Sequence, residues 1–497
     1  MDYSKLQNGS DIRGVALEGI EGEHVNLTED ACRAIGRGFV VWLEKKFGKT
    51  NPTVFIGRDS RLSGDTLVTW ASEAMRDAGA EVTVLGLAST PAMFMSTITE
   101  GAMADGSVMV TASHLPFNRN GYKFFTRNGG LEKEDIKAIL TYAGEGTESA
   151  SEKAGSIRKG SFMDTYGAIL RKKIQDGTGE EKPLEGLRIV VDAGNGAGGF
   201  FVDKVLKPLG ANTEGSQFLE PDGSFPNHIP NPENEQAMAA ITKAVADNQA
   251  DLGIIFDTDV DRAGAVLSNG EELNRNRLIA MMSAILLRGH EGAWIVTDSI
   301  TSTGLKEFIE KEGGVHHRFK RGYRNVINES IRLNNEGHES LLAMETSGHG
   351  ALKENYFLDD GAYLMVKLLI ELANGKKKGY TLESLIADLR EPMEAKEFRF
   401  KIMTDDFKTY GADVLEKLTA YAEKQEGWEI VQPNFEGLRV NIGKGWFLLR
   451  LSLHDPILPL NIESDEEGGV KEIAKELCAF LKDYELLDTE NIKAFIA

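Results

Sequence analysis

A serine and a histidine stand side by side in residues 107–123, where an apolar run gives way to turn-forming residues. The run leads into Ser113 and His114, and a proline and an Asn-Gly pair follow. These residues favour a turn, so we expect the Ser113 hydroxyl at the rim of a sheet, where ligands of open α/β sheets bind. Lys123 would return on the next strand and neutralise anionic charge. On these residues alone, an ordinary strand–turn–strand is the better interpretation.

Three aspartates alternate along residues 257–262 (Asp-Thr-Asp-Val-Asp-Arg), directly after the apolar run 252–256. Crowded carboxylate oxygens suit Mg²⁺, which usually keeps room for a substrate phosphate. A solvated acidic turn needs neither the alternation nor the adjoining arginine. An EF-hand loop would require Gly at its sixth position and Glu at its twelfth, where this chain has Arg262 and Ser268. The predicted metal ligands are therefore Asp257, Asp259 and Asp261.

Three motifs resemble those of the α-D-phosphohexomutases in type and in spacing. Residues 111–116 (Thr-Ala-Ser-His-Leu-Pro) resemble the family's phosphoserine loop, residues 257–262 its metal loop and residues 345–349 (Glu-Thr-Ser-Gly-His) its sugar-binding loop. The resemblance covers essentially the whole chain and is strongest to the phosphomannomutase/phosphoglucomutase branch. It implies an isomerase that transfers a phosphoryl group reversibly between the 1- and 6-positions of mannose or glucose phosphate.

The resemblance also implies roles for the matching residues. Ser113 would carry the phosphoryl group and complete a Mg²⁺ site with the three aspartates, and a hexose 1,6-bisphosphate would be the intermediate and activator. Arg262 and Lys123 would add positive charge. The general base stays open among His114, Lys123 and His349, with Lys123 slightly favoured by its position. The implied substrate-binding residues are Arg13, Arg324, Glu345, Ser347, His349, Arg450, Ser452 and His454.

The C-terminal phosphate loop departs from the family pattern. The family usually has Arg-x-Ser-Asn-Thr-Glu-Pro, whereas residues 450–456 read Arg-Leu-Ser-Leu-His-Asp-Pro. Arg450 and Ser452 match, but Leu453 and His454 replace an amide and a hydroxyl that normally bind the distal phosphate. A protonated His454 would donate a replacement hydrogen bond. Binding of the distal phosphate, and with it the preferred substrate, stays open.

Other functions remain open beside the mannose or glucose mutase. One is a phosphoglucosamine mutase, which the Glu-Thr-Ser-Gly-His motif disfavours slightly. Others are a phosphotransferase or phosphatase that uses the same serine and metal, and a sugar-phosphate binder without catalysis. The glycines of residues 192–199 also fit a dinucleotide-binding turn, but no acidic residue follows at the expected distance in a suitable setting, and we interpret this turn as structural.

Composition indicates an ordinary soluble protein of several domains. The chain has 497 residues, too many for one core, of which 41% are hydrophobic and 27% charged. Its net charge of -21 argues against nucleic acid or an anionic membrane as a partner. We expect a cytoplasmic protein, because the chain begins without an export signal and lacks a long apolar run. The sequence does not distinguish a monomer from a homodimer.

The motifs require strands that end in exposed loops. Alternating strands and helices, such as 53–56, 63–78, 81–85 and 107–111, predict mostly parallel, doubly wound sheets. Clustered strands near the end of the chain predict an antiparallel sheet. The predicted fold is α/β, with three doubly wound mixed α/β domains followed by a smaller α+β C-terminal domain around a central cleft. The predicted domains are 1–158 with the phosphoserine loop, 159–266 with the metal loop, 267–385 with the sugar-binding loop and 386–497 with the distal phosphate loop.

Overall fold

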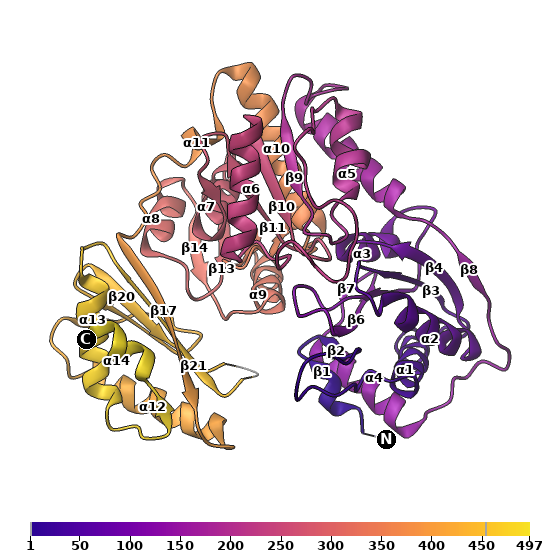
Figure 1. The fold of residues 1–497 in the computed structure, drawn as a ribbon, viewed down its shortest axis with the longest axis horizontal. Coiled ribbons are helices and arrows are strands. Elements are labelled where there is room, and N and C mark those ends of the chain that lie inside the picture. The colour runs from indigo at the N-terminus through magenta and orange to yellow at the C-terminus, as the bar shows by residue number, and fades with distance from the viewer. Residues whose placement is uncertain (1, 453–454) are drawn as a thin grey trace. The chain divides into compact units, whose positions relative to one another are not determined.

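The computed structural model describes residues 2–452 and 455–497 (Figure 1). The chain forms two compact units, each built from two separate stretches. The first unit comprises Met1–Ile285 and Ser347–Leu385, and the second comprises Leu286–Thr346 and Ile386–Ala497. Within the described residues, no helix is both long enough and apolar enough to span a bilayer.

The first unit begins with an eight-stranded sheet whose central strand leads to Ser113. Its strands are β1 (Gln7–Asn8), β2 (Asp11–Val15), β3 (Thr53–Arg58), β4 (Glu81–Leu87), β5 (Gly106–Val110), β6 (Arg119–Thr126), β7 (Gly129–Gly130) and β8 (Ile157–Lys159). The order is β1-β2-β6-β5-β3-β4-β8, with β7 on β6. β5 pairs in parallel with β3 and antiparallel with β6, and all its residues are buried. The sheet is therefore mixed, because β6 returns as a hairpin straight after the serine turn.

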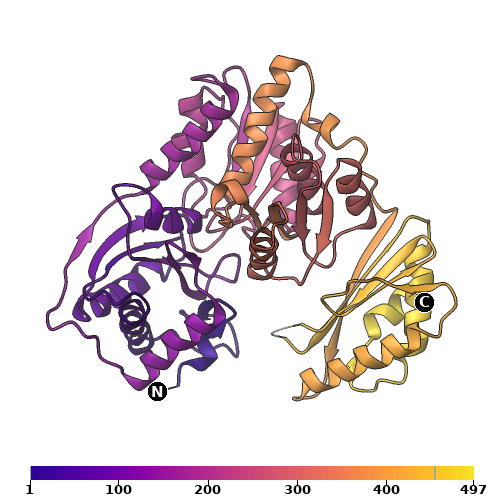
Figure 2. The same cartoon turned by 180° about the vertical axis from the view of Figure 1, so that it is seen from behind.

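Four helices flank this sheet, and a fifth leads into the next one. They are α1 (Glu29–Phe47), α2 (Gly64–Asp77), α3 (Thr90–Ile98), α4 (Lys133–Glu145) and α5 (Met163–Thr178). The apolar faces of α1, α2 and α4 share one core with the sheet, whereas α3 packs against β5 and β6 (Figures 1 and 2). Ser63, the N-cap residue of α2, makes no side-chain capping bond, and its hydroxyl accepts a hydrogen bond from Asn120.

The second sheet of the first unit carries the acidic motif. Its strands are β9 (Ile189–Asp192), β10 (Leu252–Phe256), β11 (Ala263–Leu267) and β12 (Glu272–Leu273), in the order β12-β11-β10-β9. The flanking helices are α6 (Glu235–Asn248) and α10 (Gly361–Lys378). This part of the chain also forms α7 (Arg275–Leu286), β16 (Gly350–Leu352), which precedes α10, and α11 (Leu382–Leu385), which follows it. α6 and α10 pack on opposite faces of β10 and β11 (Figures 1 and 2). β10 and β11 are antiparallel, so residues 257–262 form the turn of a hairpin.

The glycine-rich turn after β9 packs against this hairpin. A Cβ atom on Gly196 would lie 2.7 Å from the carbonyl oxygen of Thr258, and one on Gly198 would lie 2.9 Å from the ring of Phe256. The backbone of Asn195 is left-handed, with φ of 59°. These glycines are thus needed for close packing beneath the acidic turn, in agreement with a structural role.

The second unit holds a parallel sheet and an antiparallel one. The parallel strands are β13 (Trp294–Thr297), β14 (Val315–Arg318) and β15 (Ser340–Met344), with β13 in the middle, and the adjacent helices are α8 (Thr303–Lys311) and α9 (Tyr323–Asn335). The antiparallel strands are β17 (Glu394–Ile402), β18 (Trp428–Ile430), β19 (Leu438–Ile442), β20 (Gly445–Leu449), β21 (Ile457–Ser464) and β22 (Leu487–Asp488), in the order β18-β19-β20-β21-β17-β22.

Helices cover one face of the antiparallel sheet. They are α12 (Phe407–Ala422), α13 (Gly469–Leu481) and α14 (Glu490–Ile496), and their apolar residues form one core with the strands. The predicted antiparallel α+β arrangement at the end of the chain is confirmed.

Candidate active site

The turn after β5 holds Ser113 in an unusual backbone conformation. Its φ is 51°, in the left-handed region that residues other than glycine seldom adopt. The amide of Ser113 donates to Thr111 Oγ1 at 2.9 Å, which closes the turn. Residues held in this way are concentrated at functional sites, where the surrounding structure maintains the strain. The serine hydroxyl is thus presented in one fixed direction.

Arg61 stabilises the same turn by donating hydrogen bonds to its backbone carbonyl oxygens. Its Nη1 atom donates to the carbonyl oxygens of Pro116 and Arg119 at 2.8 and 2.9 Å, and its Nη2 atom donates to those of Ser113 and Leu115, both at 2.5 Å. The guanidinium is fully buried beside Asp59, 3.5 Å away, and burial raises the pKa of that carboxyl to about 6 despite the arginine. Arg61 was not predicted from the sequence. The only indication is that a second arginine follows Arg58, in the turn after β3.

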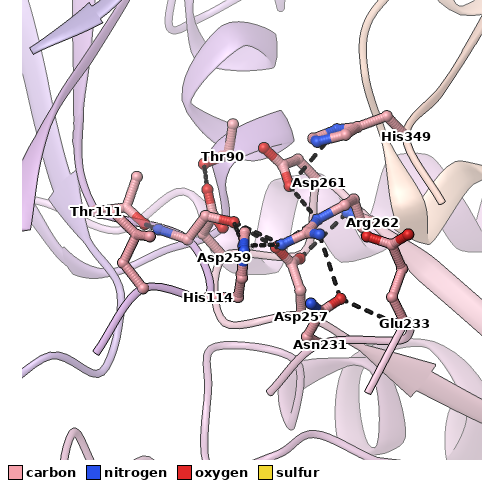
Figure 3. A network of polar contacts seen from close by, with 12 residues as sticks. Thr90, Thr111, His114, Asn231, Glu233, Asp257, Asp259, Asp261, Arg262 and His349 are labelled. Carbon is pink, nitrogen blue, oxygen red and sulfur yellow. Dashed lines mark hydrogen bonds and ion pairs between the residues drawn. The ribbon is translucent and has the colours of Figure 1, made fainter. Parts of the chain in front are cut away.

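The Ser113 hydroxyl lies between a carboxylate and a guanidinium. Ser113 Oγ donates to Asp257 Oδ2 at 2.9 Å, and Arg262 Nη2 donates to Ser113 Oγ at 2.9 Å. Arg262 also forms an ion pair with Asp257 at 3.1 Å and donates to His114 Nδ1 at 2.6 Å (Figure 3). Burial and the neighbouring Arg262 and Arg13 lower the pKa of His114 to about 2, so its imidazole is neutral and acts as an acceptor.

The three aspartates of the hairpin turn are buried together. One carboxylate oxygen from each of the three lies within 4.8 Å of the other two. Burial, followed by the charges of Asp261 and Asp259, raises the pKa of Asp257 well above its usual value. Asp259 Oδ1 and Asp261 Oδ1 are buried and have no hydrogen-bond partner among the described residues. Unpaired oxygens of this kind, from converging carboxylates, are the donor set that a hard divalent cation requires.

Lys123 and Thr90 orient two of these carboxylates. Lys123 faces Met109 across the β5–β6 pair, and its Nζ atom donates to Asp261 Oδ2 and lies 3.6 Å from Asp259. Thr90, in the first turn of α3, donates from its hydroxyl to Asp259 Oδ2 at 2.5 Å. The structure therefore places Lys123 on the predicted strand, next to the acidic turn. Thr90 was not foreseen.

His349 joins the site from the segment before β16. Its Nδ1 atom lies 2.5 Å from Asp359 and 4.0 Å from Asp261. Burial alone would lower the pKa of His349, but the two carboxylates outweigh it and raise the pKa to about 9. His349 is thus a cation at neutral pH, and it is bound by Asp359, which was not predicted from the sequence.

Arg13 reaches the serine turn from β2. Its Nη1 atom donates to the carbonyl oxygen of Ala112 at 3.2 Å, and its Nη2 atom forms an ion pair with Asp11 at 3.0 Å. A Cβ atom on Gly121 would lie 2.0 Å from the carbonyl oxygen of Ile12, so the glycine lets β6 approach β2. The predicted cation is therefore close to Ser113.

Other predicted substrate-binding residues belong to the second unit. Glu345 follows β15 and accepts a hydrogen bond from the amide of Gly322 at 2.6 Å, and Arg324 lies in the first turn of α9. Arg450 follows β20, with Nη1 4.0 Å from Glu436. The hydroxyl of Ser452 accepts a hydrogen bond from the amide of Asp455. Ser347 belongs to the first unit instead. His454 lies outside the described residues.

Three successive family models match this chain. They are the phosphoglucomutase/phosphomannomutase alpha/beta/alpha domain I over residues 4–150, domain II over residues 167–270 and domain III over residues 274–393. Together they account for most of the chain.

Curated relatives match over nearly the full length. A phosphoglucomutase of Neisseria gonorrhoeae is 30% identical over 467 residues, which is 94% of this chain and 95% of the relative. A phosphomannomutase/phosphoglucomutase of Pseudomonas putida is 31% identical over 465 residues, which is 93% of this chain and 92% of the relative.

Solved structures share the fold. A phosphoglucomutase/phosphomannomutase family protein of Burkholderia thailandensis superposes with a TM-score of 0.79 at 27% identity, covering 97% of this chain and 98% of that one. The N-acetylphosphoglucosamine mutase of Aspergillus fumigatus, solved with GlcNAc-6P and magnesium, has a TM-score of 0.54 at 13% identity, covering 91% and 96%. On this evidence, the chain belongs to the phosphoglucomutase/phosphomannomutase family of isomerases.

Proposed function

We propose that this protein moves a phosphoryl group reversibly between the 1- and 6-positions of mannose phosphate, glucose phosphate or both. Ser113 would carry the phosphoryl group, and a hexose 1,6-bisphosphate would be the intermediate. The observation that carries the proposal is the position of Ser113 Oγ, which contacts both Asp257 and Arg262 in a buried site. A serine needs such surroundings if its phosphorylated form is to be stabilised and yet remain reactive.

We further propose that Asp257, Asp259 and Asp261 bind Mg²⁺ together with an oxygen of phosphorylated Ser113. Two observations support this assignment: Asp259 Oδ1 and Asp261 Oδ1 have no hydrogen-bond partner among the described residues, and burial together with the charges of Asp261 and Asp259 raises the pKa of Asp257 although Arg262 lies beside it. A bound Mg²⁺ ion would offset negative charge on the transferring group.

The chain's own cations act on the same group. Arg262 Nη2 already donates to Ser113 Oγ and would donate to a phosphoryl oxygen in its place. Lys123 binds the Asp261 carboxylate and keeps positive charge beside the acidic turn. His114, Lys123 and His349 stay the candidates for accepting the proton of the attacking sugar hydroxyl. Lys123 and His349 carry positive charge in this structure and would first have to release a proton, whereas His114 is neutral.

The sugar and its distal phosphate would be bound by the polar residues that the family resemblance implies. The proposed contacts are Arg13, Arg324, Glu345, Ser347, His349, Arg450, Ser452 and His454. Mannose and glucose are favoured as substrates because the two curated relatives above are named for reactions on these sugars.

The proposal is tested by measuring turnover of mannose 1-phosphate, glucose 1-phosphate and glucosamine 1-phosphate, each with Mg²⁺ and a trace of its 1,6-bisphosphate. We expect conversion of mannose or glucose 1-phosphate to the 6-phosphate, and complete loss of conversion after EDTA treatment or in Ser113→Ala. Preference for glucosamine 1-phosphate would reassign the substrate. Full activity of Ser113→Ala would refute the phosphoserine scheme.

A further inference from the structure

The second unit contains a cavity of 360 Å³ whose lining is mostly polar. It lies where the first turn of α8 faces the β19–β20 hairpin, and Arg318 at the end of β14 also lines it. None of the residues of the candidate active site, Arg450 included, belongs to its lining. The volume is within the range typical of small-molecule sites.

Arg439 is the central feature of this cavity. Only 4% of its surface is exposed, and its guanidinium lies 3.5 Å from the ring centroid of Trp446. Nη1 donates to the carbonyl oxygens of Ser299 and Thr301 at 2.9 and 3.0 Å. Nη2 has no hydrogen-bond partner among the described residues. A buried cationic donor left without an acceptor is costly, so a ligand is expected to supply one.

Arg318 is a second buried guanidinium, and it adds positive charge to the cavity. Arg318 donates to the carbonyl oxygens of Thr301 and Ser302, at 3.3 and 2.7 Å. Within the described part of the chain, neither Arg318 nor Arg439 has a carboxylate within ion-pair distance. Glu463 is the carboxylate whose charge affects the pKa of both arginines most, and it accepts a hydrogen bond from the indole of Trp446 at 2.9 Å. Burial raises the pKa of Glu463 to about 7, so it neutralises less than one of the two charges.

The carboxylates at the rim of the cavity have partners of their own. Glu307 and Asp465 both form ion pairs with Arg390. Lys306, which also lines the cavity, pairs with Glu310 on the solvent side of α8. The N-terminus of α8 adds the positive end of a helix dipole. Arg318 and Arg439 therefore place two buried positive charges in the cavity, although four carboxylates, Glu307, Glu429, Glu463 and Asp465, also line it.

We propose that this cavity binds a phosphate group, either as free phosphate or as a phosphate monoester, at a site separate from Ser113 and from Arg450. The Nη2 atom of Arg439 would donate to a phosphate oxygen, and Lys306 and the first turn of α8 would supply further charge. Because Arg439 lies on β19 and Arg318 on β14, the ligand would link the two sheets of the second unit.

The test uses ¹⁹F NMR of the full-length protein labelled with 5-fluorotryptophan. The chain has five tryptophans, and Trp446→Phe identifies the resonance that reports on the cavity. We expect inorganic phosphate to shift this resonance saturably, and to do so equally in Arg450→Gln, which removes a proposed active-site contact. Glycerol 3-phosphate is titrated in parallel: a lower midpoint for it assigns the site to monoesters, and a lower midpoint for phosphate assigns it to the free ion.

Arg439→Gln should raise the midpoint at least tenfold. Because a buried substitution can prevent folding, Lys306→Gln provides an exposed alternative and should raise it about threefold. Lys311→Gln is the matched control, since Lys311 lies on the same helix, pairs with Asp388 and does not line the cavity. The proposal would be overturned if the Trp446 resonance did not respond to phosphate. It would also be overturned if the midpoint in both Arg439→Gln and Lys306→Gln were the same as in the wild type.

Discussion

At the scale of single residues, the site depends on guanidinium groups that make several directed contacts at once. Arg262 contacts Ser113, His114 and Asp257 with one planar group. A lysine keeps the charge but cannot reproduce this geometry. We therefore expect Arg262→Lys to reduce kcat/KM by about 100-fold to 1,000-fold, the range found when one preorganised donor is removed.

The measurement is a steady-state assay of the mutase reaction. Arg58→Lys is the matched control, because Arg58 is the last residue of β3 and pairs with Asp65, whose side chain is 79% exposed. It should stay within about twofold of the wild type, since a pair with an exposed carboxylate contributes little. Equal losses in the two variants would show that the contacts of Arg262 have no special role.

Arg61 also makes several directed contacts at once, and its contacts stabilise the fold. Arg61→Met would remove one donor from each of four carbonyl oxygens and leave Asp59 without its counter-charge. Breaking a buried pair in this way costs about 3–5 kcal/mol. We expect a loss of this size in the free energy of urea unfolding, whereas Arg37→Met, at an exposed position of α1, should change it by about 0.5 kcal/mol or less. A small loss of unfolding free energy in Arg61→Met would mean that the turn carrying Ser113 keeps its conformation without the contacts of Arg61.

At the scale of elements, two hairpins bring the chemistry together. The β5–β6 hairpin presents Ser113 and returns Lys123, and the β10–β11 hairpin presents the aspartates. Both could be predicted, because each motif directly follows an apolar run and the return strand is local. Thr90 could not be predicted: it meets Asp259 across 169 residues, and nothing near α3 in the sequence indicates which distant loop its first turn will face. Asp359 was not predicted either, although it contacts His349 across only 10 residues.

The glycine turn beneath the acidic hairpin gives a prediction at this scale. A Cβ atom on Gly196 would lie 2.7 and 2.8 Å from backbone atoms of Thr258, so Gly196→Ala must displace the turn that carries the aspartates. We expect at least a tenfold rise in the Mg²⁺ concentration that gives half-maximal activity. Gly264→Ala, on β11, is the control, because its added Cβ would meet only side-chain atoms, at 3.3 Å or more. An unchanged Mg²⁺ requirement in Gly196→Ala would separate this turn from the metal site.

At the scale of the whole molecule, an acidic protein must bind an anionic group. The net charge of -21 is compensated locally by buried cations, among them Arg13, Arg61, Lys123 and Arg262. Layer type and order along the chain could be predicted from alternating patterns, although the first sheet is less parallel than expected. The three boundaries between the four predicted domains and the central cleft stay predictions, because they depend on how separate layers pack, which local patterns do not specify.

Stability of the whole chain should also depend on pH through His228. Its Nε2 atom lies 3.1 Å from Asp192 at the end of β9, and its Nδ1 atom 2.9 Å from the carbonyl oxygen of Ile229. Burial alone would lower the pKa of His228, but the bond to Asp192 and its charge outweigh burial and raise the pKa. A raised pKa in the folded state means that protonated His228 stabilises the fold fully below about pH 6.5, the unfolded value, and loses this effect as the pH rises through the folded value.

The prediction concerns the difference between the wild type and His228→Gln, which keeps a hydrogen-bond donor to Asp192 but no charge. We expect the wild-type advantage in the free energy of urea unfolding to be largest near pH 6 and to shrink steadily towards pH 8.5. His290→Gln is the control, because His290 is largely exposed and its pair with Glu339, at 3.2 Å, lies at the surface. A His228→Gln difference that stays constant with pH would show that the Asp192 pair is neutral throughout and that the histidine acts only by packing.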